Sequence, residues 1–217
     1  MAALLLLAAG GVASEGWWWL QPLAKVDLPS DGLAKHPIDA FVQQRLARDG
    51  LTPSPPAEPR TLIRRLHFDL LGLPPSPETV AEFAANPTDP AYHQLIDRLL
   101  ASPRYGERWA RHWLDVARYA DTGGFETDLY FPNAWRYRDY VIEAFSKDRP
   151  LDQLIREHIA GDLLPSDDPE TKLRNMTATG FLVLGPHNYE NQDKELLELE
   201  IIDEQLDTIG RSFLGMT

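Results

Sequence analysis

Apolar residues recur at helical spacing along most of the chain. From residue 36 onward they return every three or four positions, as in Ile38, Phe41, Val42 and Leu46, whereas the strict alternation of a half-buried strand is scarce. Such spacing places apolar side chains on one face of an α-helix. The pattern predicts helices over residues 37–49, 60–71, 77–85, 90–101, 103–120, 133–147, 151–160, 169–183 and 192–213.

Prolines and glycines mark the ends of these segments. Five residues precede a proline that suits the first position of a helix, and all but the histidine have a good N-cap side chain. The five pairs are His36-Pro37, Ser76-Pro77, Asp89-Pro90, Ser102-Pro103 and Asp168-Pro169. Gly72 and Gly161 stand where a helix would end in a left-handed residue. We therefore predict an all-α fold, an orthogonal array of about nine helices.

The first 35 residues follow neither the helical nor the strand period. Residues 1–13 are apolar and end in small residues, like the stretch before a signal-peptidase cleavage site, and they are too short to cross a bilayer. They favour export to the periplasm or the extracellular space, although a translation start inside a longer chain, or a fragment boundary, would give the same pattern. Residues 14–35 predict an extended arm rich in tryptophan and proline, and residues 36–217 a single helical domain.

Composition narrows the function classes. The 217 residues include 33 acidic and 21 basic side chains, and the net charge of -12 argues against nucleic acid or an anionic membrane surface as a partner. There is no cysteine, which excludes disulfides, thiolate metal sites and covalent haem attachment within these residues. After residue 13, no segment reaches the roughly 20 uncharged apolar residues that a transmembrane helix needs.

The densest group of candidate residues lies in the helix predicted over 103–120. At about 100° per residue, one half of this helix is apolar and the other half is polar. The polar half contains Arg104, Glu107, Arg108, Arg111, His112, Asp115, Arg118 and Tyr119. One interpretation is a solvated face with Glu107–Arg111 and Arg111–Asp115 pairs. The other is a network covered by neighbouring helices, in which Asp115 orients His112 and the arginines bind an anion or a facing carboxylate.

An acidic loop follows this helix directly. Asp121, Glu126 and Asp128 surround the flexible pair Gly123-Gly124. Oxygen ligands on a glycine-rich loop suit calcium, and two carboxylates could act as general acid and base in a glycan-active enzyme. The spacing differs from an EF-hand, and a plain soluble turn has the same composition.

Tryptophans form a further group of candidates. Trp17, Trp18 and Trp19 are consecutive in the arm, and Trp135 lies beside Arg136 near the start of a predicted helix. Exposing three consecutive tryptophan side chains to water would be unfavourable in free energy. We expect either that they pack over the domain or that they form an aromatic platform on which sugars or a partner stack, as in a carbohydrate-binding module.

The last predicted helix is amphipathic. Its apolar positions follow steps of three and four and comprise Leu196, Leu199, Ile202, Leu206, Ile209 and Phe213. Glu200, Asp203, Glu204 and Asp207 lie together on another face. We expect the apolar stripe to pack into the core and the acids to face solvent. An alternative function for this acidic exterior is to bind a basic protein partner.

Several ordered motifs resemble one known family. They are Trp18-x-x-Gln21-Pro22-Leu23, Pro37-Ile38-Asp39-Ala40-Phe41-Val42, Leu62-Ile63-Arg64-Arg65-Leu66, Asp69-Leu70-x-Gly72-Leu73-Pro74-Pro75, Ser102-Pro103-Arg104-Tyr105-Gly106-Glu107-Arg108-Trp109, Trp113-Leu114-Asp115-x-Ala117-Arg118-Tyr119-Ala120-Asp121, Trp135-x-Tyr137-Arg138-Asp139, Ala160-Gly161-Asp162-Leu163-Leu164-Pro165 and Gly210-Arg211-x-Phe213-Leu214-Gly215. Together they resemble the planctomycete cytochrome-c-associated domain of unknown function.

The resemblance implies a place in a large exported protein. In that family the domain often follows a haem-c-type domain, and a C-x-x-C-H motif lies shortly after the position equivalent to Thr217. The implied haem c would therefore belong to a downstream segment that these residues do not contain. We expect a helical scaffold domain of an exported, haem-c-associated electron-transfer protein whose partners are the other domains of a longer parent. The alternatives are a glycan-binding or glycan-active site at 121–128 and an acidic interaction module. The resemblance carries over no catalytic residue.

Overall fold

The structure, a computed structural model, describes residues 21–29, 36–124 and 128–216. In this part of the chain the regular secondary structure is helical, and the strand-like pairing is limited to a single bridge between Thr122 and Tyr130. The all-α prediction is confirmed. By internal contacts the chain divides into two compact units, residues 1–56 and 57–217.

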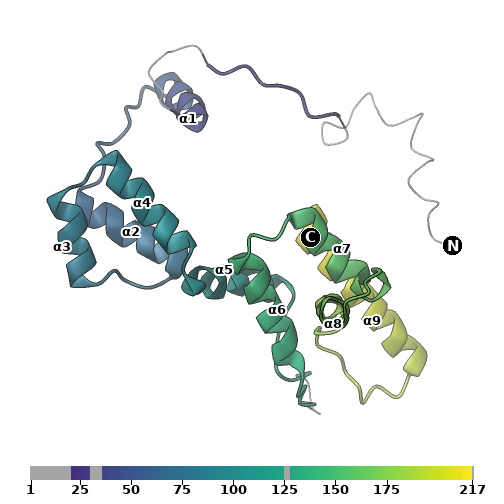
Figure 1. The fold of residues 1–217 in the computed structure, drawn as a ribbon. Coiled ribbons are helices and arrows are strands. Elements are labelled where there is room, and N and C mark those ends of the chain that lie inside the picture. The colour runs from purple at the N-terminus through teal and green to yellow at the C-terminus, as the bar shows by residue number, and fades with distance from the viewer. Residues whose placement is uncertain (1–20, 30–35, 125–127, 217) are drawn as a thin grey trace. The chain divides into compact units, whose positions relative to one another are not determined.

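The described helices follow the predicted ones closely (Figure 1). They are α1 (Pro37–Arg48), α2 (Pro59–Leu71), α3 (Pro77–Ala85), α4 (Asp89–Leu100), α5 (Pro103–Val116), α6 (Ala134–Ser146), α7 (Leu151–Ala160), α8 (Pro169–Ala178) and α9 (Lys194–Ile209). Short turns extend three of them: the 3₁₀ turns η2 (Gly161–Leu163) and η3 (Thr179–Leu182), and the π-helical turn η4 (Gly210–Leu214).

Side-chain caps explain most of the helix starts. Ser76, Ser102 and Asp168 each accept a hydrogen bond from a backbone N–H of the first turn, and His36 Nδ1 accepts one from the N–H of Ile38. Helix α4 begins one residue earlier than predicted because the Thr88 hydroxyl, rather than Asp89, accepts from the N–H of Ala91. Helices α2, α6 and α7 have no side-chain cap.

Several helix ends differ from the prediction: α8 and α9 end at Ala178 and Ile209, where η3 and η4 follow, and two other ends differ in local conformation or length. Gly72 is left-handed as expected, with φ 70°, but Gly161 has φ −59° and continues into η2. Gly161 is instead required because a Cβ there would collide with the backbone of Asn175. The predicted helix 103–120 stops at Val116: Arg118 has φ 55°, and the N–H of Tyr119 bonds to the carbonyl of Leu114, which closes a Schellman turn.

In the first unit, the described residues contain α1. Only Ala40 of this helix is buried, whereas Ile38, Phe41 and Val42 are exposed. Residues 21–29 form neither helix nor strand.

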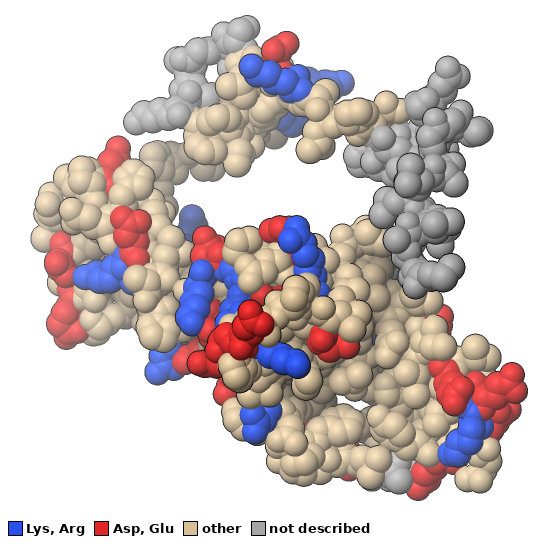
Figure 2. All heavy atoms as spheres, turned by 45° about the vertical axis from the view of Figure 1, so that its right-hand side comes forward, with Lys and Arg blue, Asp and Glu red and all other residues tan. Residues whose placement is uncertain are grey.

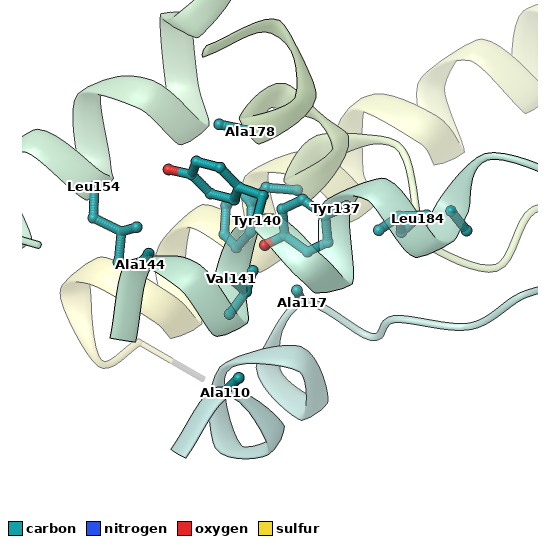
Figure 3. Close-up of a cluster of buried hydrophobic side chains, with 11 residues drawn as sticks. Ala110, Ala117, Tyr137, Tyr140, Val141, Ala144, Leu154, Ala178 and Leu184 are labelled. Atoms are coloured by element: carbon teal, nitrogen blue, oxygen red, sulfur yellow. The ribbon is translucent and has the colours of Figure 1, made fainter. Parts of the chain in front are cut away.

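The second unit contains two separate apolar clusters. The smaller one lies between α2, α3 and α4, and its buried members are Ile63, Phe83, Leu95 and Leu99. The larger one is built by α5, α6, α7, α8 and η3, with α6 at its centre. Figure 3 shows Tyr137, Tyr140 and Val141 of α6 between Ala110 and Ala178. The buried members of the larger cluster are Ala110, Ala117, Ala134, Tyr137, Tyr140, Val141, Ala144, Leu154, Ala178, Phe181 and Leu184.

Helices α5 and α6 approach each other closely at one glycine. A Cβ at Gly106 would lie 2.7 Å from the carbonyl oxygen of Ile142 and would collide with the Ser146 hydroxyl. The hydroxyl of Ser146 in turn donates to that same carbonyl at 2.8 Å. Any side chain at position 106 would collide with α6, so this close approach of the two helices requires glycine.

Candidate functional site

Helix α7 of the second unit contains a buried carboxylate. Glu157 of α7 is 1% exposed and accepts hydrogen bonds from Arg149 (2.6 Å), Tyr140 (2.6 Å) and Gln153 (2.7 Å). Burial alone would raise the pKa of Glu157, but these three donors outweigh it and hold the pKa below its ordinary value. Burial also raises the pKa of Tyr140, and the adjacent carboxylate adds to that rise. Glu157 is therefore ionised and fully paired at neutral pH.

The next residue forms a second buried network. The ring of His158 is fully buried, and its Nδ1 lies 2.7 Å from the carbonyl oxygen of Leu154, so Nδ1 carries the proton. The other nitrogen, Nε2, accepts from the indole N–H of Trp113 (3.0 Å) and the hydroxyl of Tyr137 (3.0 Å). Burial lowers the pKa of His158 to about 4. The imidazole is thus neutral and fixed in one tautomer.

Sequence reasoning does not single out Glu157 and His158, because neither belongs to a recognisable motif. A signal was nevertheless present. Both residues lie three and four positions after Leu154, and this spacing puts them on the face of α7 that Leu154 buries. Two polar residues on a buried face indicate an internal hydrogen-bond network.

Beside these networks lies an aromatic pocket of about 490 Å³ between α5, α6 and α7. Its wall includes Trp113 and Arg149, the outer members of the two networks. Trp109, 36% exposed, packs against the edge of the His112 ring at a centroid distance of 5.4 Å. The predicted residue His112 is therefore at the rim of a largely apolar pocket. The full lining is Tyr105, Trp109, His112, Trp113, Val116, Ala144, Phe145, Asp148, Arg149, Leu151 and Leu154.

The remaining polar residues of α5 are mostly exposed. Arg104 pairs with Glu107 at 3.1 Å, and Arg111 has no ion-pair partner in the described part of the chain. The expected Glu107–Arg111 and Arg111–Asp115 pairs are thus not formed. Nor does any hydrogen bond between described residues join Asp115 to His112, so the solvated face describes this stretch better than a covered network does.

Two arginines of the predicted set behave differently. Arg108 is half-buried, and its side chain lies over Gly72. A Cβ added to Gly72 would lie 2.8 Å from the Cδ of Arg108. Arg118, beyond the end of α5, forms an ion pair with Glu204 of α9 and donates to the hydroxyl of Thr208. These arginines connect helices of the second unit: Arg108 packs against the end of α2, and Arg118 binds α9.

The acidic loop after α5 is only partly described. The carboxylate of Asp121 accepts a hydrogen bond from the Tyr119 hydroxyl at 2.8 Å, and burial together with this bond raises the pKa of Tyr119 to about 12. Asp128 is exposed and has φ 40°. Glu126 lies outside the described residues. The predicted calcium site and the predicted acid–base pair of a glycan-active enzyme therefore stay predictions.

The aromatic platform is likewise only partly described. Trp135 is 44% exposed, and the guanidinium of Arg136 lies 4.9 Å from its ring centre. Trp17, Trp18 and Trp19 lie outside the described residues. In the described ranges, no three histidine or acidic side chains gather as metal ligands would.

Helix α9 is turned the opposite way from the expected orientation. Its buried residues are Leu197 and Thr208, and the ion pair of Glu204 with Arg118 lies on the same side. Leu199, Ile202 and Leu206, which we expected in the core, are 58%, 51% and 62% exposed. Of the predicted stripe, only Ile209 and Phe213 pack against the larger cluster. The expectation of a packed apolar stripe is therefore wrong for most of the helix, and Glu204 faces Arg118, whereas Glu200 and Asp203 are exposed as expected.

None of the helices in the described ranges combines the length and the apolar composition that crossing a bilayer requires.

On the face shown in Figure 2, charged side chains gather in groups that are separated by wide uncharged areas.

Residues 37–217 match the model of the family PSCyt2, described as a protein of unknown function (DUF1549). The match spans most of the chain, so the protein belongs to this family. The resemblance to the planctomycete cytochrome-c-associated domain is thereby confirmed. No curated protein and no solved structure matches the chain significantly.

Proposed function

We propose that this chain is the helical scaffold domain of an exported, haem-c-associated redox protein. The observation that carries the proposal is the outer face of α9, where Leu199, Ile202 and Leu206 are each more than half exposed in a row. A contiguous apolar face of this kind marks a surface that other protein covers. The redox part of the proposal comes from the resemblance to the planctomycete cytochrome-c-associated domain, since the matched family is itself described only as a protein of unknown function.

Haem c itself does not fit the residues of this chain. Its covalent attachment needs cysteine thiols, and the sequence has none. In the proposed arrangement another segment of the parent protein holds the haem. The role of the present helices is then to hold that segment in position.

The rigidity of the second unit suits such a role. Three ionisable groups, Glu157, His158 and Tyr140, are buried and hydrogen-bonded to one another or to neighbouring helices. Satisfied buried networks fix a unique arrangement of the helices that contribute to them. We infer that these groups stabilise the scaffold.

The experiment compares the natural full-length protein, purified from the exported fraction, with the 217-residue chain. A pyridine haemochrome assay should show haem bands in the long form alone. Haem in neither form would overturn the redox part of the proposal. The scaffold part is tested separately by amide exchange: the backbone of α9 around Ile202 should exchange at least about tenfold more slowly in the long form, and equal rates in the two forms would overturn it.

A further inference from the structure

The outer face of α9 combines an apolar stripe with acidic edges. Leu199, Ile202 and Leu206 follow one another at steps of three and four, and Leu196 at the start of the helix is 45% exposed. This spacing forms a continuous ridge on one side of a helix. A facing helix could pack its own apolar residues against this ridge, as in a helix-in-groove complex.

Acidic residues line both edges of this ridge. At about 100° per residue, Glu198 adjoins Ile202 on one side and Asp203 adjoins Leu199 on the other. Glu195 lies in line with the ridge, one turn before Leu199, Glu200 lies beyond Asp203, and all four acids are exposed. No ion pair joins any of them to another described residue, whereas Asp207 farther along pairs with Arg211 at 2.8 Å. The surface therefore has unpaired negative charge beside an uncovered apolar stripe.

We propose that the outer face of α9 binds a helix whose apolar stripe is flanked by lysine and arginine. The inference rests on the proposed scaffold function only in that both need this face to be covered. Apolar burial would supply affinity, and the facing charges would select the partner and its orientation. A second copy of α9 is a poor occupant, because packing two such faces together would bring the acidic edges opposite each other.

Two synthetic model helices of about five turns test the charge selection. Both have leucines at the same helical spacing, and all other positions are lysine in one and glutamate in the other. Fluorescence anisotropy with the labelled peptides should show that the chain binds the lysine helix at least about 100-fold more tightly than the glutamate helix. The affinity should fall about tenfold or more between roughly 0.05 M and 0.5 M salt, because screening weakens charge pairing at an exposed surface.

Variants locate the binding. Leu199→Ser with Leu206→Ser should weaken binding of the lysine helix at least about tenfold, and Glu198→Gln with Asp203→Asn should reduce its salt dependence. These positions are exposed, so circular dichroism should show an unchanged fold.

Matched controls change equally exposed positions elsewhere in the same unit. Leu163→Ser with Leu173→Ser should leave the affinity unchanged, since these leucines are 78% and 53% exposed but lie outside α9. Asp162→Asn with Asp167→Asn removes the same amount of charge from another exposed region and should leave the salt dependence unchanged.

Three results would overturn the inference. The first is equal affinity for the two model helices. The second is full affinity in the Leu199→Ser, Leu206→Ser variant. The third is self-association of the chain that this variant abolishes, because a second copy would then be the occupant. Slower amide exchange of α9 in the long form together with any of these results would leave the scaffold proposal standing. Salt-dependent binding with no haem in the long form would support this inference and remove the redox context.

Discussion

Arg118, just beyond the end of α5, forms an ion pair with Glu204 in the middle of α9. The same guanidinium donates to the backbone carbonyl of Glu204 at 3.2 Å and to the hydroxyl of Thr208. Arg118 also has φ 55°, a conformation that costs free energy for any residue except glycine. The contacts with α9 offset that cost, so the turn after α5 and the position of α9 depend on each other.

Replacing Arg118 with asparagine separates these two effects. Asparagine tolerates the left-handed conformation but cannot reach Glu204 or Thr208. For Arg118→Asn we expect amide exchange in α9 to accelerate several-fold, and the free energy of unfolding to fall by about 1–2 kcal/mol. The control is Arg111→Gln, which removes an exposed arginine of α5 that has no ion-pair partner in the described residues. Equal exchange in α9 for both variants would show that Arg118 does not anchor it.

We expect substitutions of two arginines, one in a buried ion pair and one in an exposed pair, to differ strongly in how much they lower the free energy of unfolding. Arg149 and Glu157 have side chains only 8% and 2% exposed, whereas the Arg156–Asp152 pair is 69% and 66% exposed. Removing one partner of a buried pair strands the other charge, so Arg149→Met should cost about 3–5 kcal/mol in urea denaturation. Arg156→Met should cost less than about 1 kcal/mol. Similar costs for the two substitutions would contradict the described burial.

Acid should destabilise the protein through His158. Its pKa falls from 6.5 to about 4 on folding, so the unfolded chain takes up the proton first as the pH falls. The contribution is fully present above about pH 6.5 and is lost as the pH falls toward 4, by about 3 kcal/mol in all. Urea denaturation at a series of pH values measures this loss directly.

The variant His158→Gln isolates the contribution of this residue. Glutamine does not titrate, so the dependence of unfolding free energy on pH between about 6.5 and 4 should become shallower. Burial also lowers the pKa of His67 and of His187, and these two residues retain part of the slope in the variant. If the unfolding free energy of the variant depends on pH as steeply as that of the unmodified chain, groups other than His158 cause the loss of stability.

Alanine substitutions at two glycines should have different effects on the stability of the protein. At Gly106 a methyl group meets the Ile142 carbonyl at 2.7 Å, so Gly106→Ala should force α5 and α6 apart and cost about 1–3 kcal/mol. At Gly210 the nearest atom is Cβ of Met216 at 3.7 Å and φ is −58°, so Gly210→Ala should be neutral or slightly stabilising. Thermal unfolding of the two variants tests this contrast.

Most of the fold was predictable because it depends on local chemistry. A proline after Ser76, Ser102 or Asp168 sets the first turn and the preceding side chain caps it, so these starts follow from two adjacent residues. The end of α5 was not predictable in this way. There a long-range contact from Arg118 supports a conformation that arginine rarely adopts, and no neighbouring residue indicates it.

The candidate site was less predictable, because periodicity identifies an apolar stripe but not the surface that covers it. The stripe of α9 exists as expected, yet Leu197 and Thr208 face the core while Leu199 and Leu206 face outward. The orientation of α9 agrees with the position of Arg118, which binds Glu204 on the side of the helix opposite to Leu199 and Leu206. The sequence pattern alone treats Glu204 as part of a solvated acidic face.

The two apolar clusters of the second unit have a calorimetric consequence. Ile63 and Val141 are both fully buried, yet they belong to clusters with no member in common. Truncations at these two positions should therefore change the free energy of unfolding additively. If α2–α4 and the helices around α6 unfold as two cooperative blocks, the van't Hoff enthalpy of residues 57–217 will be smaller than the calorimetric enthalpy, which a single calorimetric scan tests.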